Sequence, residues 1–156
     1  MIEKTFPAIA AREGRFIGGL SMGGYGALRI ALGYPDRFSS ANSHSGAVMY
    51  GSFASDLPER QLMLGPNPVG SNHDVLTLAK RAGAAGNLPR LRIDCGVDDF
   101  LIEANRSLHR SFIEMAIAHE YEEFSGAHTW DYWDLHVRDA IGFHLANSKN
   151  EIRSLE

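Results

Sequence analysis

The sequence predicts one α/β domain, a three-layer α/β/α sandwich around a mostly parallel sheet. Short apolar segments typical of strands alternate about four times with amphipathic segments typical of helices. The connections between successive strands contain helices, so they must be parallel crossovers. With 156 residues, 44% of them hydrophobic, the chain can bury one core but not two ordinary ones. We therefore expect residues 1–156 to form a single domain.

The first half of the chain predicts a helix, a strand, a helix and a strand. A short helix is expected over residues 2–11, and the apolar run RFIGGL at 15–20 is typical of a strand. Helical spacing of apolar residues follows over 23–35, where glycine and proline end it. Small residues at 38–46 predict a second strand. Residues 47–72 contain three prolines and several glycines, so we expect them to be irregular.

The second half continues the alternation. Its pattern predicts a helix, a buried strand, a long amphipathic helix, a strand and a final helix, over residues 73–83, 88–96, 100–118, 119–124 and 130–146. In parallel α/β sheets, functional residues lie in the loops beyond the carboxyl ends of the strands. The loops after Leu20, Gly96 and Phe124 are therefore the places where a site is expected.

Charge and cysteine content argue against several functional classes. The 19 acidic and 15 basic residues give a formal net charge of -4, and the basic residues are scattered, so no nucleic-acid partner is expected. Cys95 is the only cysteine, so neither an intramolecular disulfide nor a thiolate zinc cluster is expected. No segment resembles a signal peptide or approaches the roughly 18 apolar residues of a membrane span. We expect a soluble, cytoplasmic protein without a membrane partner.

The first of the three loops holds a G-x-S-x-G pentapeptide, GLSMG, between a predicted strand and a predicted helix. In such a nucleophile elbow the serine, here Ser21, occupies a strained turn, and Gly19 and Gly23 let strand and helix approach closely. The hydroxyl then lies at the amino end of the helix, where N–H groups and the helix dipole stabilise an oxyanion. We expect the Met22 N–H to be an oxyanion-hole donor. A glycine-rich turn with an incidental serine is the alternative.

A nucleophilic serine needs a base that removes its proton. The best candidate among the seven histidines is His128, because it lies in the loop after the last strand, at the end of the sheet where Ser21 emerges. His44, at a strand end, is expected to line the site without acting as the base. The remaining histidines lie within or beside helices, where a lone histidine is usually a surface or core residue; they are His73, His109, His119, His136 and His144.

The imidazole in turn needs a carboxylate that holds its tautomer and stabilises the imidazolium. On α/β folds such triads occur in the chain order Ser, acid, His. The segment CGVDDFL offers Asp98 and Asp99 after a strand, while Asp94 lies inside that strand. Adjacent residues at a strand exit point in different directions, so spacing alone leaves both Asp98 and Asp99 open.

These segments resemble the esterase D group of α/β-hydrolases, which includes S-formylglutathione hydrolases, tributyrin-type acetylesterases and many feruloyl esterases. The resemblance covers nearly the whole chain and rests on GLSMGGYGALRIALGYPDRF, LRIDCGVDDFLIEANR and EYEEFSGAHTWDYWDLHV. It is greatest to small bacterial tributyrin or acetyl esterases. It implies Asp99 as the acid, His128 as the base and hydrolysis of short-chain acetyl, butyryl or feruloyl-type esters through an acyl-enzyme on Ser21, with no cofactor and no metal.

The sequence also departs from this group, because its members carry further strands ahead of the elbow. The chain resembles the C-terminal half of an α/β-hydrolase fold, and so a truncated domain. The nucleophile strand, central in the full fold, would then be an edge strand. We therefore expect a homo-oligomer that covers residues 15–20, and impaired turnover if the second oxyanion-hole donor is missing.

Three aromatic residues lie near the predicted site or on the helices beside it. Tyr25, Trp130 and Trp133 are candidates for lining an acyl pocket, although aromatic residues at helical spacing more often pack a core. The alternatives to ester hydrolysis are thioesterase action on S-formylglutathione, acyl transfer to another alcohol, and an inactive truncated hydrolase that serves as an assembly or interaction module. A metal hydrolase is less favoured, because the histidines form neither H-x-x-x-H nor H-E-x-x-H.

Overall fold

Four parallel strands form one sheet, and they follow one another across it in chain order. The computed structural model describes residues 5 and 8–153. Each strand pairs with the next in parallel, which confirms the predicted crossovers. The strands are β1 (Phe16–Leu20), β2 (Ser40–His44), β3 (Arg90–Gly96) and β4 (Glu120–Phe124). Among the described strands, β1 forms one edge and β4 the other, so the nucleophile strand is an edge strand here, as expected.

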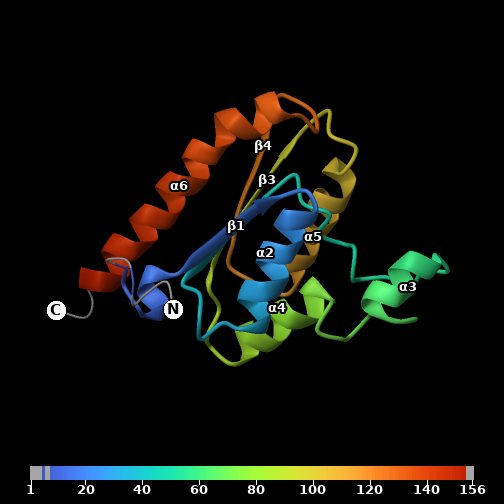
Figure 1. Cartoon of the computed structure of the whole chain (residues 1–156), viewed down its shortest axis with the longest axis horizontal. Helices are drawn as coiled ribbons and strands as arrows, with labels where there is room; N and C mark the ends of the chain where they lie inside the picture. Colours follow the sequence, from blue (N-terminus) through green and yellow to red (C-terminus); the bar gives the residue numbers. More distant parts are fainter. Residues whose placement is uncertain (1–4, 6–7, 154–156) are drawn as a thin grey trace.

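Helices cover the sheet on both faces, which confirms the three-layer architecture (Figure 1). On one face lie α2 (Met22–Gly33), α4 (Val75–Ala84) and α5 (Ile102–Glu114). The long α6 (Trp130–Arg153) crosses the opposite face and contacts β1, β2 and β3. Because each crossover is a helix joined by loops, the carboxyl ends of all four strands meet at one edge of the layers, as a parallel sheet requires.

Three details differ from the sequence-based expectations. Half of the helix expected at 2–11 lies outside the described residues; residues 8–10 have no regular structure, and a short 3-10 helix, η1 (Arg12–Gly14), follows. The segment expected to be irregular contains α3 (Pro58–Leu64), where proline at the first helical position is favourable. The helix expected over 100–118 ends at Glu114, because Ala116 adopts a φ of 55°, which a right-handed helix cannot continue.

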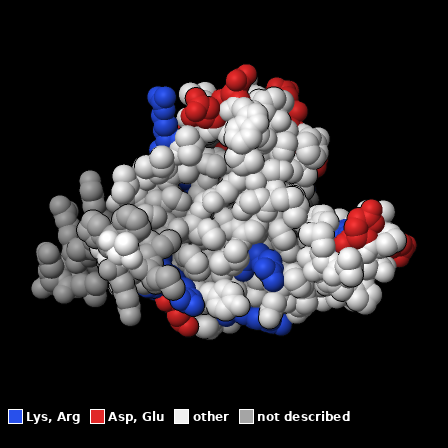
Figure 2. Space-filling view, viewed as in Figure 1, with Lys and Arg blue, Asp and Glu red and all other residues white. Residues whose placement is uncertain are grey.

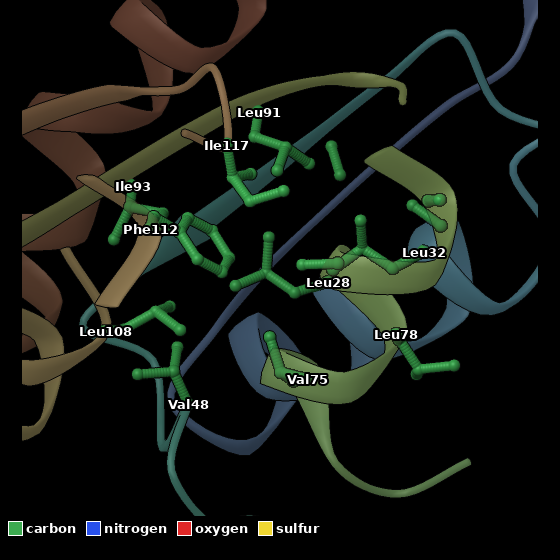
Figure 3. Packing of buried hydrophobic residues seen from close by; sticks show 14 of the residues in the cluster. Leu28, Leu32, Val48, Val75, Leu78, Leu91, Ile93, Leu108, Phe112 and Ile117 are labelled. Carbon is green, nitrogen blue, oxygen red and sulfur yellow. The ribbon is translucent and has the colours of Figure 1, made fainter. Parts of the chain in front are cut away.

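The core lies between the sheet and the α2, α4 and α5 layer (Figure 3). Every second residue of β3 faces it, so Leu91 and Ile93 pack with apolar side chains of the three helices. The intervening residues Arg92 and Asp94 are also buried, but they face α6. One face of β3 therefore packs against apolar side chains, and the other makes polar contacts. The labelled helical side chains of the core are Leu28, Leu32, Val75, Leu78, Leu108 and Phe112.

The surface beside β1 is mainly uncharged. Figure 2, seen from this side, shows few Lys, Arg, Asp or Glu side chains between α6 and α2. Within the part of the chain that the structure describes, no helix combines the length and the apolar character needed to cross a membrane. The cytoplasmic location expected from the sequence stays a prediction.

Candidate active site

Ser21 occupies a strained turn between β1 and α2. Its φ of 54° and ψ of -121° lie outside the regions that residues with a side chain usually adopt. Two backbone hydrogen bonds hold the turn from β2 and the loop after it: the Ser21 N–H donates to the His44 carbonyl (2.9 Å), and the Ser21 carbonyl accepts from the Ala47 N–H (3.0 Å). The strain is therefore held by the rest of the fold, and Ser21 is placed at the N-cap of α2.

The two glycines of the pentapeptide have different roles. A Cβ on Gly19 would lie 2.4 Å from the carbonyl carbon and oxygen of Gly23, so a side chain at position 19 would collide with the first turn of α2. A Cβ on Gly23 would meet nothing within 4 Å. The expectation that both positions must lack a Cβ is thus correct for Gly19 and wrong for Gly23, whose backbone is the surface that Gly19 approaches.

Ser21, His128 and Asp99 form a chain of hydrogen bonds at the carboxyl edge of the sheet. The His128 Nε2 lies 3.0 Å from the Ser21 Oγ, and the His128 Nδ1 lies 2.8 Å from the Asp99 Oδ2. Asp99 is only 2% exposed, and its Oδ1 accepts a hydrogen bond from the Leu101 N–H (2.8 Å). Asp98, the other open choice, is exposed, whereas the buried Asp99 carboxylate makes the bond to the imidazole. The geometry therefore brings together the three side chains that the sequence nominated.

The His128 loop lies against the end of β3. A Cβ on Gly96 would lie 2.2 Å from the Gly126 carbonyl oxygen, so only glycine lets the loop come this close. The same carbonyl accepts a hydrogen bond from the Asp98 N–H (2.9 Å). Gly126 itself has a φ of 134°, a conformation that favours glycine. These contacts bring the loop after β4 next to the acid loop after β3.

The expected oxyanion-hole donor also lies at this edge. Met22 is the first residue of α2, and the first N–H groups of a helix have no partner inside it. Such a group beside the Ser21 Oγ is suited to an oxyanion, because the helix dipole adds to its partial positive charge. The identity of a second donor stays open, and with it the expected impairment of turnover.

Two of the three aromatic candidates lie beside the triad and one does not. The Trp133 ring makes an edge contact with the His128 ring, with centroids 4.9 Å apart, and Trp130 packs edge-on against Trp133 at 5.2 Å. Tyr25 is 5% exposed and belongs to the hydrophobic core, where its hydroxyl donates to the His73 carbonyl (2.7 Å). Burial raises the pKa of Tyr25. The structure therefore corrects the expectation that Tyr25 lines a pocket.

A groove of about 430 Å³ runs between β1 and α6. It begins at Leu20, one residue before Ser21, and continues along the strand to Phe16. Its walls are largely apolar, because α6 contributes Trp130, Trp133, Val137 and Ile141; His44 is also among the lining residues. The triad therefore opens beside an apolar groove at the edge strand.

The side chains of the other histidines have contacts away from the Ser21 hydroxyl. The His44 Nδ1 bonds to buried Asp94, and His44 contacts Ser21 only through its backbone carbonyl, which accepts the Ser21 N–H. Four of the remaining five have side-chain partners elsewhere: His109 pairs with His119, His136 with Asp139 and His144 with Ser40. The fifth, His73, precedes α4, and its carbonyl accepts the Tyr25 hydroxyl. Within the described residues, no three His, Cys, Asp or Glu side chains gather as a metal site would require.

Sequence reasoning missed a buried polar cluster around Asp94, on β3. Asp94 is fully buried and accepts hydrogen bonds from Arg92, His44 and the Tyr132 hydroxyl. Arg92 also reaches Glu122 (2.7 Å). The available signal was the alternation in RLRIDCG, where charged residues occupy every second position of an otherwise apolar strand.

Fold and site together define the class. A parallel sheet between helical layers, with a serine on a strained strand-to-helix turn and an acid and a histidine after two later strands, is the arrangement of α/β-hydrolases. A protein-family model for esterases matches residues 1–144, so the chain belongs to the esterase family. The acetyl esterase of Caldicellulosiruptor saccharolyticus is 36% identical over 150 residues, which cover 88% of this chain and 56% of that protein.

Solved structures agree with this assignment. The fluorophosphonate-binding serine hydrolase FphF of Staphylococcus aureus superimposes with a TM-score of 0.80 at 29% identity, covering 92% of this chain and 58% of that one. The S-formylglutathione hydrolase FrmB of the same organism gives a TM-score of 0.78 at 29% identity, covering 92% and 59%. The resemblance to the esterase D group is confirmed. The chain spans between 56% and 59% of the length of these relatives.

Proposed function

We propose that this chain is a serine carboxylesterase that hydrolyses short-chain acyl esters through an acyl-enzyme on Ser21. The observation that carries the proposal is the hydrogen-bond chain from the Ser21 Oγ through the His128 imidazole to the Asp99 carboxylate. This order of nucleophile, base and buried acid is the arrangement that makes a serine hydroxyl reactive. Membership of the esterase family supports the same reaction class.

The geometry suggests the following steps. As the Ser21 Oγ attacks the ester carbonyl carbon, the His128 Nε2 takes the hydroxyl proton, and Asp99 stabilises the resulting imidazolium. The carbonyl oxygen becomes an oxyanion beside the Met22 N–H. When the C–O bond to the alcohol breaks, His128 gives its proton to the leaving oxygen. A water molecule, deprotonated by His128, then attacks the acyl-enzyme, and the carboxylic acid leaves as Ser21 regains its proton.

Acetyl esters are the substrates that we propose first, because the curated relative is an acetyl esterase. Thioester hydrolysis is the nearest alternative, since the FrmB neighbour is an S-formylglutathione hydrolase. The same triad serves both reactions; a thiolate leaving group needs less help from His128 than an alkoxide does. Comparing acetyl ester and acetyl thioester turnover by one preparation of the protein separates the two.

Turnover of p-nitrophenyl acetate by Ser21→Ala tests the proposal. We expect kcat to fall by at least about a thousandfold, because the remaining groups supply only binding and oxyanion stabilisation. Ser107→Ala is the matched control, since this serine lies on α5 away from the triad, and it should keep wild-type turnover. Wild-type turnover by Ser21→Ala would contradict the proposal.

An inactive interaction module is the second candidate, favoured by the apolar groove that runs along the edge strand β1. A fluorophosphonate probe distinguishes it from an enzyme, because only an activated serine reacts. Rapid labelling supports the esterase; absence of labelling in folded protein supports the module.

We further propose that a second copy of this chain covers the β1 edge. Trp130, Val137 and Ile141 are exposed and recur along α6 at spacings of seven and four residues, so they share one side of the helix beside the groove. An antiparallel pair of β1 strands about a two-fold axis would place the two α6 helices on the same face of a joined sheet. Light scattering at micromolar concentration should show a dimer, and Ile141→Glu should dissociate it. A wild-type monomer would contradict this.

A further inference from the structure

The cluster around Asp94 plays no part in the hydrolysis steps, but two of its members adjoin the site. The His44 carbonyl accepts the Ser21 N–H, and Tyr132 lies against Gly126, two residues before His128. The Asp94 carboxylate is fully buried and receives the Tyr132 hydroxyl and the His44 Nδ1, each at 2.9 Å, together with the Arg92 guanidinium. Burying such a carboxylate is unfavourable unless hydrogen bonds compensate it. The cluster therefore holds its members in fixed positions, because moving any of them leaves a buried charge without a partner.

Tyr132 connects this cluster to the catalytic loop. It lies four residues after His128, in the first turn of α6, and is buried. Its ring packs on the backbone of the loop, since a Cβ on Gly126 would lie 2.9 Å from the Tyr132 Cδ2. The first turn of α6 follows this loop directly, and it is closed by the Trp133 N–H, which donates to the Thr129 carbonyl (3.3 Å). A shift of Tyr132 would therefore move the segment that carries His128.

β3 thus holds the loop in two ways. Near its end, the Asp98 N–H donates to the Gly126 carbonyl, and Asp99 bonds to the imidazole itself. Further back along the strand, Asp94 holds the hydroxyl of Tyr132. Asp94 lies on β3, and Asp99 lies in the loop that follows β3. Both contacts therefore fix the position of the His128 loop relative to β3.

We propose that Tyr132 is a positioning residue for His128, and that its hydroxyl, bound to buried Asp94, fixes the first turn of α6 so that the imidazole lies between Ser21 and Asp99. The inference rests on the proposed esterase function. Its physical basis is that a reacting group displaced by about 1 Å loses on the order of a hundredfold in rate. A satisfied buried network supplies the required rigidity.

The nucleophile side is joined to the same carboxylate. The His44 Nδ1–H donates to the Asp94 carboxylate, and the backbone carbonyl of His44 accepts the Ser21 N–H (2.9 Å). Burial and the neighbouring Asp94 raise the pKa of Tyr132, so its hydroxyl stays protonated and remains a donor. One buried carboxylate therefore contacts both the strand behind the nucleophile and the helix behind the base.

Tyr132→Phe tests the inference because it removes the hydroxyl and keeps the ring. We expect kcat for p-nitrophenyl acetate to fall about tenfold while KM stays within about twofold, because the change affects alignment and not substrate contact. The matched control is Tyr121→Phe. Tyr121 on β4 also donates to a carboxylate, Glu123 (2.8 Å), but this carboxylate is held by Arg106 of α5 and not by the buried cluster around Asp94. It should keep kcat within about twofold.

Two further measurements separate positioning from a general loss of structure. Active-site titration with a fluorophosphonate counts competent sites, so kcat is compared per reactive Ser21. In a His128→Ala background, Tyr132→Phe should cause no further loss of the residual activity, because its effect passes through His128. Wild-type kcat for Tyr132→Phe, an equal loss in Tyr121→Phe, or a tenfold loss that persists without His128 would overturn the inference. Turnover that survives Ser21→Ala would instead contradict the esterase proposal.

Discussion

The two faces of the sheet are packed by different interactions, although they belong to the same strands. Toward α2, α4 and α5, β3 presents Leu91 and Ile93 to an apolar core (Figure 3). Toward α6 it presents Arg92 and Asp94, which are as deeply buried but bonded to polar partners. Apolar burial is non-directional and tolerates small movements. Hydrogen bonds to a buried carboxylate are directional and do not.

This difference matches what each layer positions. On the apolar face, Ser21 lies at the N-terminus of α2. The strained turn and its backbone hydrogen bonds already fix the position of Ser21 there. The His128 loop leads into α6. Apolar contacts alone would fix the rotation of α6 about its own axis only loosely. The polar face supplies the directional contact that α6 needs. On the role proposed for Tyr132, the apolar face stabilises the fold, and the polar face both stabilises it and orients the site.

Phe112→Ala should have the largest effect on stability. The side chain is fully buried on α5 among the core residues, so its truncation removes apolar contacts and leaves a cavity worth about 4 kcal/mol of unfolding free energy. Urea unfolding measures the loss. Ile113→Ala, at the next position of the same helix and exposed, should cost less than about 1 kcal/mol. Equal losses would mean that this face is not the main source of stability.

Arg92→Met should destabilise the polar face by a comparable but smaller amount, about 3 kcal/mol, because Asp94 keeps its buried charge and loses its cationic partner. Arg90→Met, on the same strand, removes an exposed pair with Glu120 and should cost less than about 1 kcal/mol. Both are measured by urea unfolding. An unfolding free energy for Arg92→Met close to that of the wild type would show that α6 is held by apolar contacts alone.

Acid should weaken the polar face before the apolar one. Burial, with His44 and Arg92 nearby, lowers the pKa of His144 to about 4, while an unfolded histidine titrates near about 6.5. Between these values the unfolded chain binds the proton and the folded one does not, so this contribution to stability is full above about pH 6.5 and is lost as the pH falls toward 4. We expect Tm to drop by roughly a few degrees over this interval.

The matched variant for this pH effect is His144→Gln, which cannot titrate and keeps a polar group facing Ser40. Its Tm should change less between pH 6.5 and 4 than that of the wild type, as followed by circular dichroism. An unchanged pH dependence in His144→Gln would assign the acid sensitivity to other groups.

Local patterns made much of this fold predictable. The apolar run at 15–20 and the glycines after it place β1, the turn and α2 almost where the structure has them, because strand, elbow and helix signals are all short-range. Ser21 and His128 followed from loops that a parallel sheet gathers at one edge. Spacing alone left Asp98 and Asp99 open; the family resemblance implied Asp99, and the hydrogen bond between Asp99 and His128 agrees with it.

Long-range contacts were not predictable in the same way. Asp94 and Tyr132 are 38 residues apart and meet only when α6 packs on the sheet. Tyr25 looked like a pocket residue, but the neighbouring α4 region covers it and its hydroxyl bonds to the His73 carbonyl. Helical periodicity gives the buried side of a helix; it does not say which neighbour covers that side.

The central claim is that His128 and Asp99 make Ser21 a nucleophile, and mapping of a fluorophosphonate adduct tests it most directly. Mass spectrometry of the digested wild-type protein should find one adduct, on Ser21. In His128→Ala, with the fold checked by circular dichroism, labelling at the same probe concentration and time should be nearly absent. An adduct on another residue, or labelling of Ser21 at the wild-type rate without His128, would contradict the account.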